Sequence, residues 1–170
     1  SRLRAHQPRG PYRLMGWSLG GALAQAMAAE LSRQGEDVAA LVLLDSYPAS
    51  AWAGQPLMDE DAVLRTMLMA DGDHGTEGLA TATLVQRLLR PGRAFAPLGE
   101  HGLRAWSRRL AHLVSLFRQA PTPRHDGPVD FFAARHPPHL GLDPACWAPH
   151  ADLARWRVHA LDCSHAGISD

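Results

Sequence analysis

Residues 12–21 read Tyr-Arg-Leu-Met-Gly-Trp-Ser-Leu-Gly-Gly, and this stretch decides the fold. It predicts an apolar strand, a very tight turn and the start of a helix. Within it, residues 16–20 form a G-x-S-x-G motif, in which a serine on a sharp strand-to-helix turn is presented to substrate. The glycines two places before and two places after the serine are expected to let the backbones pack closely. We therefore predict that Ser18 is a nucleophile.

The segment after the motif is predicted to be a helix over residues 19–34, because apolar side chains recur every four residues along it. The amino end of a helix presents unpaired N–H groups and the positive end of the helix dipole, which suit a negatively charged oxygen. One donor to such an oxyanion is expected to be the backbone N–H of Leu19, the residue after the nucleophile.

A second buried strand follows. Residues 39–44 read Ala-Ala-Leu-Val-Leu-Leu and end at Asp45, and an unbroken apolar run is typical of a parallel strand buried on both faces. This strand is expected to neighbour the first one, which places Asp45 and Ser18 at the same edge of the sheet, where catalytic groups gather. The alternative for Asp45 is a turn or helix-capping role before Pro48.

The rest of the chain completes an α/β pattern with a mostly parallel sheet. Three helical stretches near residues 59–70, 76–90 and 101–119 predict a helical lid insertion at about residues 46–126. The alternative is that these helices pack on the sheet in the ordinary way. Strand character returns at residues 128–135, a Pro-rich loop covers 136–149, and residues 153–161 predict an alternating, half-buried edge strand.

A serine nucleophile needs a base, and the base needs an orienting carboxylate. Among ten histidines, His165 is favoured because it follows the last strand by a few residues, in a loop at the same edge as Ser18. Asp45 is the preferred carboxylate because it lies directly at a strand end. The rival is Asp143, in the loop after the next strand. The chain order serine, acid, histidine is the one that this chemistry uses in open α/β sheets.

Composition excludes several classes of function. The basic residues are all arginine, and their 17 charges balance 17 acidic ones, so no nucleic-acid or anionic-membrane surface is indicated. There is no P-loop, dinucleotide fingerprint or H-E-x-x-H motif, and His136 and His139 are expected in a surface loop rather than at a metal. No cofactor or metal of its own is therefore expected. The lack of a secretory signal and the two cysteines, expected to be reduced thiols, favour a soluble cytoplasmic protein.

The motifs in combination resemble the thioesterase domains of nonribosomal peptide synthetases, with polyketide synthase thioesterases matching less well. The resemblance is carried by residues 10–21, 41–48 and 161–165, together with the Phe-Phe-Ala-Ala-Arg stretch at 131–135. It implies an α/β-hydrolase fold and supports Asp45 over Asp143, because this family places its acid one strand after the elbow. Against the family's pattern, the chain is expected to be a domain incomplete at both ends, lacking the first strands and the last helix.

The resemblance also implies a reaction. A peptidyl or acyl chain arrives as a thioester on the phosphopantetheine arm of a carrier protein, and Ser18 attacks it with His165 as base and Asp45 holding the tautomer. Water or a nucleophile of the chain itself then releases the product. The alternatives are a stand-alone editing thioesterase, a general carboxylester hydrolase, and a non-catalytic domain that acts only in docking or structure. The sequence leaves open the substrate, the choice of hydrolysis or cyclisation, the oligomeric state, and whether Trp17 faces a pocket or the sheet.

Overall fold

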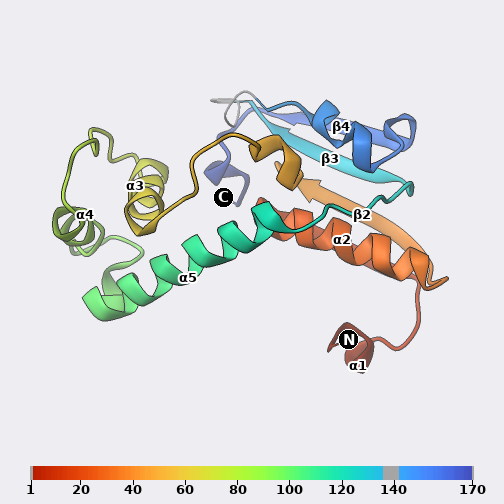
Figure 1. Ribbon diagram of the computed structural model, residues 1–170, viewed down its shortest axis with the longest axis horizontal. Coiled ribbons are helices and arrows are strands. Elements are labelled where there is room, and N and C mark those ends of the chain that lie inside the picture. Colours follow the sequence, from red (N-terminus) through yellow and green to blue (C-terminus); the bar gives the residue numbers. More distant parts are fainter. Residues whose placement is uncertain (1, 136–141, 170) are drawn as a thin grey trace. The chain divides into compact units, whose positions relative to one another are not determined.

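The computed structural model describes residues 2–135 and 142–169. The chain divides into two compact units (Figure 1). One unit consists of residues 1–53 and 120–170 and contains the sheet, whereas the other consists of residues 54–119 and is helical.

The sheet unit is built on four parallel strands, in the order β1-β2-β3-β4. Their bounds are β1 Tyr12–Trp17, β2 Val38–Leu44, β3 Val129–Ala134 and β4 Trp156–Leu161. The strand after the elbow helix does pair with the elbow strand, and the last strand lies at an edge of this sheet, as the sequence predicts. The α/β class with a parallel sheet is thereby confirmed.

Helix α2, Leu19–Arg33, connects β1 to β2 and packs against both strands. Most of the residues that it buries are alanine or glycine, with Ala28 fully inaccessible, so helix and sheet can approach closely. A short helix, α1 Arg2–His6, precedes β1. The predicted span of residues 19–34 is correct to within one residue, although Leu23 and Met27 of the apolar period are 58% and 40% exposed.

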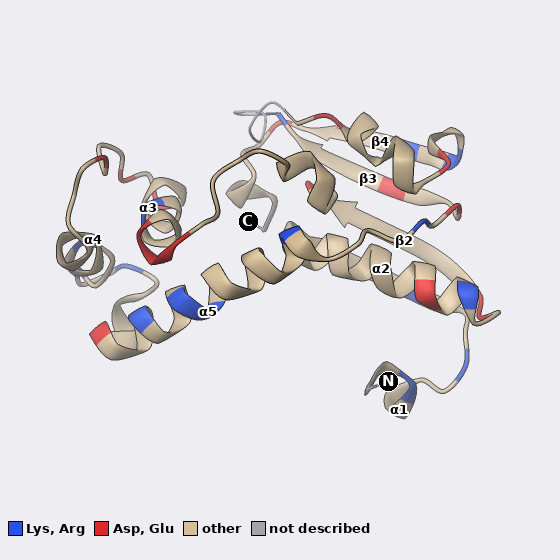
Figure 2. Cartoon of the chain, in the orientation of Figure 1, with Lys and Arg blue, Asp and Glu red and all other residues tan. Residues whose placement is uncertain are grey.

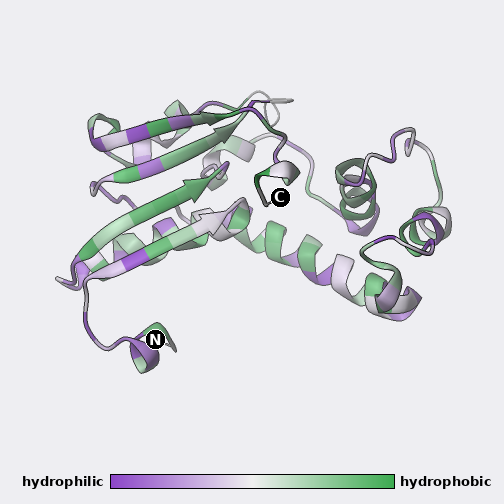
Figure 3. Cartoon of the chain, turned by 180° about the vertical axis from the view of Figure 1, so that it is seen from behind, coloured by the Kyte–Doolittle hydropathy of each residue, from purple (hydrophilic) through white to green (hydrophobic). Residues whose placement is uncertain are grey.

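The core of the sheet unit is centred on β2, which Figure 3 shows as a continuous hydrophobic arrow. Leu41 and Leu43 are 1% and 0% exposed, and Phe131 and Trp147 are fully buried with them. Burying such side chains contributes about 1.5–3 kcal/mol each, which is why the unbroken apolar run identified this strand correctly.

Two stretches differ from the prediction. Residues 144–150, expected to be loop, form a 3-10 helix, and residues 153–155 form another in place of the start of β4. In both cases an aspartate just before the turn accepts a hydrogen bond from a backbone N–H: Asp143 from Ala145 and Asp152 from Ala154. Such side-chain bonds favour a turn over an extended backbone, which explains both differences.

The helical unit contains α3 Glu60–Ala70, α4 Thr81–Leu88 and α5 Gly99–Gln119, so the three predicted helices are present. Helix α4 begins five residues later than predicted, because Gly78 just before it takes a positive φ of 70° that ends regular structure. The unit has its own apolar core, formed by Val63, Leu64, Met67, Leu68, Leu84, Val85, Leu88 and Leu103.

Charged residues lie along this unit (Figure 2), with acidic residues in the first turn of α3 and arginines along α5. Asp59 caps α3 by accepting a hydrogen bond from Ala62 N at 2.8 Å. Within the described parts of the chain, no helix combines the length and apolarity needed to cross a membrane.

Candidate active site

The register of the sheet brings two of the predicted residues to neighbouring strand ends. Trp17 pairs with Leu44 across β1 and β2. Immediately beyond this pair, Ser18 N–H donates to Leu44 O at 3.0 Å, and Asp45 N–H donates to Phe132 O at 2.7 Å. Ser18 and Asp45 therefore follow adjacent strands at the carboxyl edge of the sheet, the edge at which ligands bind in open α/β folds.

Backbone strain is concentrated at these same two positions. Ser18 has φ 54° and Asp45 has φ 42°, and they are the only non-glycine residues with positive φ in the described ranges. Such conformations cost of the order of 1–3 kcal/mol and persist where the surrounding structure enforces them, typically at functional sites. The sharp turn that the motif predicts for Ser18 is therefore present.

The glycines around Ser18 do not all have the expected role. A Cβ on Gly16 would lie 2.2 Å from the carbonyl oxygen of Gly20, and one on Gly21 would lie 2.4 Å from Ser46 Cβ. A Cβ on Gly20 meets nothing within 4 Å. The close approach of backbones thus requires Gly16 and Gly21, and the expectation for Gly20 was wrong, because the helix start turns Gly20 outward and Gly21 toward the sheet.

Leu19 is the first residue of α2, as expected for the oxyanion donor. At that position a backbone N–H has no carbonyl partner within the helix. The N–H and the helix dipole are both available to stabilise negative charge beside Ser18.

The structure also brings His165 and Asp45 together. His165 Nδ1 lies 2.7 Å from Asp45 Oδ2, and the Asp45 side chain is fully buried. The other carboxylate oxygen, Oδ1, accepts from Tyr47 OH at 3.0 Å and from Ala134 N–H at 3.3 Å. A buried carboxylate with this set of donors is held in one orientation.

The protonation states follow from these contacts. Burial opposes ionisation of Asp45, but hydrogen bonds from His165 and Tyr47, with the charge of His165 and the Ala134 N–H, together hold the pKa of Asp45 below its usual value. Burial and the Asp45 charge raise the pKa of Tyr47, so its hydroxyl keeps its proton and donates. An ionised carboxylate only accepts, so Nδ1 of a neutral His165 carries the proton and Nε2 is its basic nitrogen.

The rival acid is placed elsewhere. Asp143 caps the 3-10 helix at residues 144–150 through Ala145 N–H at 2.7 Å. Within the described residues the Ser18 hydroxyl is not hydrogen-bonded to His165. The two residues are linked through Trp17, which precedes Ser18 and whose indole N–H donates to His165 O at 3.1 Å. Such catalytic hydrogen bonds often tighten only when substrate binds.

Sequence reasoning did not assign two residues that shape the site. Tyr47 supports the carboxylate, and Trp147 Nε1 donates to Ser46 O at 2.9 Å, which anchors the turn after Asp45. Tyr47 lies inside the Asp-Ser-Tyr-Pro stretch that carries the family resemblance, so that stretch held a usable signal. Trp147 lies in the 3-10 helix at residues 144–150, and nothing in the neighbouring sequence indicates its partner.

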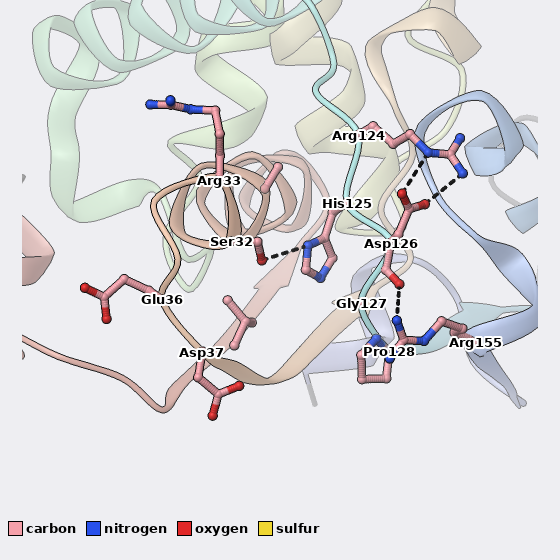
Figure 4. A pocket seen from close by; sticks show the side chains of 12 residues that line it. Ser32, Arg33, Glu36, Asp37, Arg124, His125, Asp126, Gly127, Pro128 and Arg155 are labelled. Carbon is pink, nitrogen blue, oxygen red and sulfur yellow. Dashed lines mark hydrogen bonds and ion pairs between the residues drawn. The ribbon is translucent and has the colours of Figure 1, made fainter.

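A pocket of about 500 Å³ lies at the opposite end of the strands, between the end of α2 and the segments that enter β2, β3 and β4 (Figure 4). It contains a serine–histidine pair, with Ser32 Oγ 3.5 Å from His125 Nδ1. Within the described ranges no carboxylate is hydrogen-bonded to this histidine, and the neighbouring Asp126 is paired with Arg124. The carboxyl end of a helix also presents carbonyl oxygens, which disfavour an oxyanion. The pocket therefore lacks the chemistry of the candidate active site.

His125 makes the stability of the sheet unit dependent on pH. It is 4% exposed, its Nε2 has no hydrogen-bond partner among described residues, and burial lowers its pKa below the usual value of about 6.5. Asp126 opposes this shift and Arg155 adds to it. Because the folded-state pKa is the lower one, the contribution to stability is present above about pH 6.5 and is lost as the pH falls toward the folded pKa.

We accordingly expect the free energy of unfolding of the parent chain to fall more steeply between pH 8 and pH 5 than that of His125→Gln. Urea unfolding at several pH values measures both slopes. His6→Gln is the matched control, since His6 is exposed in the same unit. Equal slopes in the parent and His125→Gln contradict the prediction.

The possible metal pair of the sequence, His136 and His139, lies outside the described residues. Within residues 2–135 and 142–169, no group of three or more His, Cys, Asp or Glu side chains is arranged to hold a metal ion.

Comparison with known proteins places this geometry in context. The family model for the thioesterase domain matches residues 1–170. The chain is 31% identical to a dimodular nonribosomal peptide synthase of Bacillus subtilis strain 168 over 98% of its own length, and 31% identical to enterobactin synthase component F of Escherichia coli K12, also over 98%. It spans 7% and 12% of those two proteins.

Solved structures agree. The NocB thioesterase domain, determined as a covalent complex with a fluorophosphonate nocardicin G analogue, is 26% identical and superposes with a TM-score of 0.66 over 99% of this chain and 63% of its own. A four-domain nonribosomal peptide synthetase bound to AMP and glycine shares the fold, with 19% identity and a TM-score of 0.72 over 98% of this chain and 14% of its own. Because the family model covers the whole chain and relatives at 31% identity align over nearly all of it, this protein belongs to the thioesterase domain family and has its α/β-hydrolase fold.

Proposed function

We propose that this chain releases a peptidyl or acyl group from the phosphopantetheine arm of a carrier protein, by hydrolysis or macrocyclisation through an acyl-Ser18 intermediate. The observation that carries the proposal is the 2.7 Å contact between His165 Nδ1 and the buried Asp45. Trp17, the residue before Ser18, donates a hydrogen bond to the backbone oxygen of the same His165. Family membership supports the reaction class, and the relatives that are peptide synthetases support the carrier-bound substrate.

In the first half of the reaction, His165 Nε2 takes the proton of Ser18 as its Oγ attacks the thioester carbonyl. Asp45 keeps the proton on Nδ1 and stabilises the imidazolium that forms. The tetrahedral intermediate collapses as the C–S bond breaks, and the imidazolium proton goes to the phosphopantetheine sulfur. The products are acyl-Ser18 and a carrier with a free thiol.

In the second half, His165 Nε2 takes a proton from water, or from a hydroxyl or amine of the bound chain, as that group attacks the acyl-Ser18 ester. Collapse of the second intermediate returns the proton to Ser18 Oγ. The backbone N–H of Leu19 donates to the oxyanion in both halves, and loss of one such donor typically costs about 10²–10³ in rate. The proposal requires no cofactor beyond the arm that the carrier protein brings.

The test compares substrates. This chain is incubated with a carrier protein loaded with a peptidyl thioester, with the same carrier bearing an acetyl group, and with a p-nitrophenyl ester of the same acyl group. We expect kcat/KM for the peptidyl carrier to exceed the other two by at least about tenfold, because binding energy from carrier and peptide is used in the transition state. Intact-mass spectrometry of the carrier and product measures the release.

Preference for the acetyl carrier overturns product release in favour of editing. Preference for the p-nitrophenyl ester overturns it in favour of a general carboxylester hydrolase. No turnover of any substrate, with folding verified by circular dichroism, favours a domain that acts only in docking or structure.

A further inference from the structure

Trp17 lies between Gly16 and the proposed nucleophile, and the sequence leaves its orientation open. In the structure its indole Nε1 donates to the backbone oxygen of His165 at 3.1 Å. Its ring also packs on the imidazole, with centroids 5.1 Å apart and planes inclined by 30°. One side chain therefore contacts both the backbone and the ring of His165.

These contacts matter because of the path that leads to His165. The loop starts where β4 ends, at Leu161, and its histidine reaches Asp45 at the end of β2. Strand β3 lies between, so the loop crosses two strand spacings, roughly 10 Å. Along this path Arg135 N–H donates to Cys163 O at 3.1 Å, which ties the loop to the end of β3.

The hydrogen bond between His165 Nδ1 and Asp45 fixes one point of the ring and does not by itself prevent tilt or rotation about that bond. Catalytic groups need to stay within about 0.5 Å and 10–20° of the productive geometry. The Trp17 indole limits the tilt by packing on the imidazole and limits movement of the loop by binding the His165 carbonyl. Because Trp17 immediately precedes Ser18, this contact ties the base to the same turn that carries the nucleophile.

We infer that Trp17 is a positioning residue, which holds His165 in register with both Ser18 and Asp45 without touching substrate. The inference rests on the proposed function, in which His165 is the base and Ser18 the nucleophile. Trp17 is 42% exposed, and its hydrogen bond to His165 O lies at the surface of the sheet unit.

The chain offers a matched control. Trp106 in α5 is 40% exposed, and its ring lies 5.8 Å from that of Phe95 within the helical unit. A Trp106→Phe variant therefore makes the same chemical change at a similarly exposed tryptophan of the other unit.

The experiment measures two properties of the parent, Trp17→Phe, Trp17→Leu and Trp106→Phe. The first is the second-order rate of labelling by a small fluorophosphonate, followed by intact mass. The second is the downfield proton NMR signal of the His165 Nδ1–H bonded to Asp45, which requires no substrate. Thermal unfolding of each variant verifies that it is folded at the assay temperature.

We expect Trp17→Phe to slow labelling about tenfold, because it loses the indole hydrogen bond and keeps an aromatic ring. Trp17→Leu loses both contacts and should be slower still, and in both variants the NMR signal should shift or broaden. Trp106→Phe should match the parent in both measurements.

If the parent is labelled and both Trp17 variants are labelled at the same rate as the parent, the inference alone is overturned, whatever the NMR signal does. A parent that takes up no phosphonate overturns the proposed function, and the positioning role is overturned with it. The two failures are therefore distinguishable in one set of measurements.

Discussion

Ser18→Ala is expected to abolish formation of the fluorophosphonate adduct, whereas the parent chain gains one adduct per molecule. The probe reports an activated serine because phosphorus is attacked by Oγ only when a base removes its proton. Ser18 has the strained φ of 54°, lies at the start of α2 and is adjacent to the residue that contacts His165. The NocB thioesterase domain, a relative of this chain, was solved as a covalent complex with a fluorophosphonate compound.

Ser32→Ala is a matched control for this prediction, because Ser32 is another serine beside a histidine, with 3.5 Å between its Oγ and His125 Nδ1. It should be labelled like the parent, while His165→Ala should be labelled far more slowly. Intact mass followed by peptide mapping locates the adduct. An adduct on Ser32 would show that the pocket of Figure 4 is the reactive site, and full labelling of Ser18→Ala would show that Ser18 is not the nucleophile.

Asp45→Asn is expected to lower kcat/KM for a peptidyl thioester about 10⁴-fold, the size of effect seen when the orienting acid of a serine triad loses its charge. Asn is nearly isosteric, so the packing of this buried position is preserved. Its amide nitrogen, however, donates where a carboxylate oxygen accepts, and the His165 tautomer that leaves Nε2 basic is no longer favoured. The imidazolium formed during attack also loses its counter-charge.

Asp143→Asn is the corresponding control, since asparagine caps a helix about as well as aspartate and the Asp143 side chain bonds to Ala145 N–H. Its kcat/KM should stay within about twofold of the parent. Steady-state kinetics of both variants, with urea unfolding to compare stabilities, decides between the two acids. The reverse result, with Asp143→Asn inactive and Asp45→Asn active, would contradict the assignment.

Both acids were candidates from the sequence because each follows a predicted strand. The tertiary contacts distinguish the two acids. Asp45 contacts His165, which lies 120 residues later in the chain, whereas Asp143 caps the 3-10 helix that follows it. A single sequence carries no record of a contact between residues so far apart. Only the order of strands in the sheet brings the loop after β4 over the end of β2.

The glycines of the motif also show that some features are predictable from the sequence and others depend on tertiary packing. The G-x-S-x-G spacing predicted a close approach at Gly16, where a Cβ would lie 2.2 Å from Gly20 O. It did not reveal that Gly21, rather than Gly20, faces Ser46, because that depends on the angle at which α2 packs on β2.

By itself the sequence determined the local elements: the elbow strand, the helix of period four after it, the buried apolar strand ending at Asp45, and the helices between residues 54 and 119. These follow from hydrophobic periodicity and turn chemistry, which act between residues close in the chain. Only the tertiary structure decided the partners of Asp45, the support given by Tyr47 and the contact of Trp17 with His165. Those contacts join segments that are distant in sequence or depend on one exact turn, and they exist only once the sheet has aligned its strand ends.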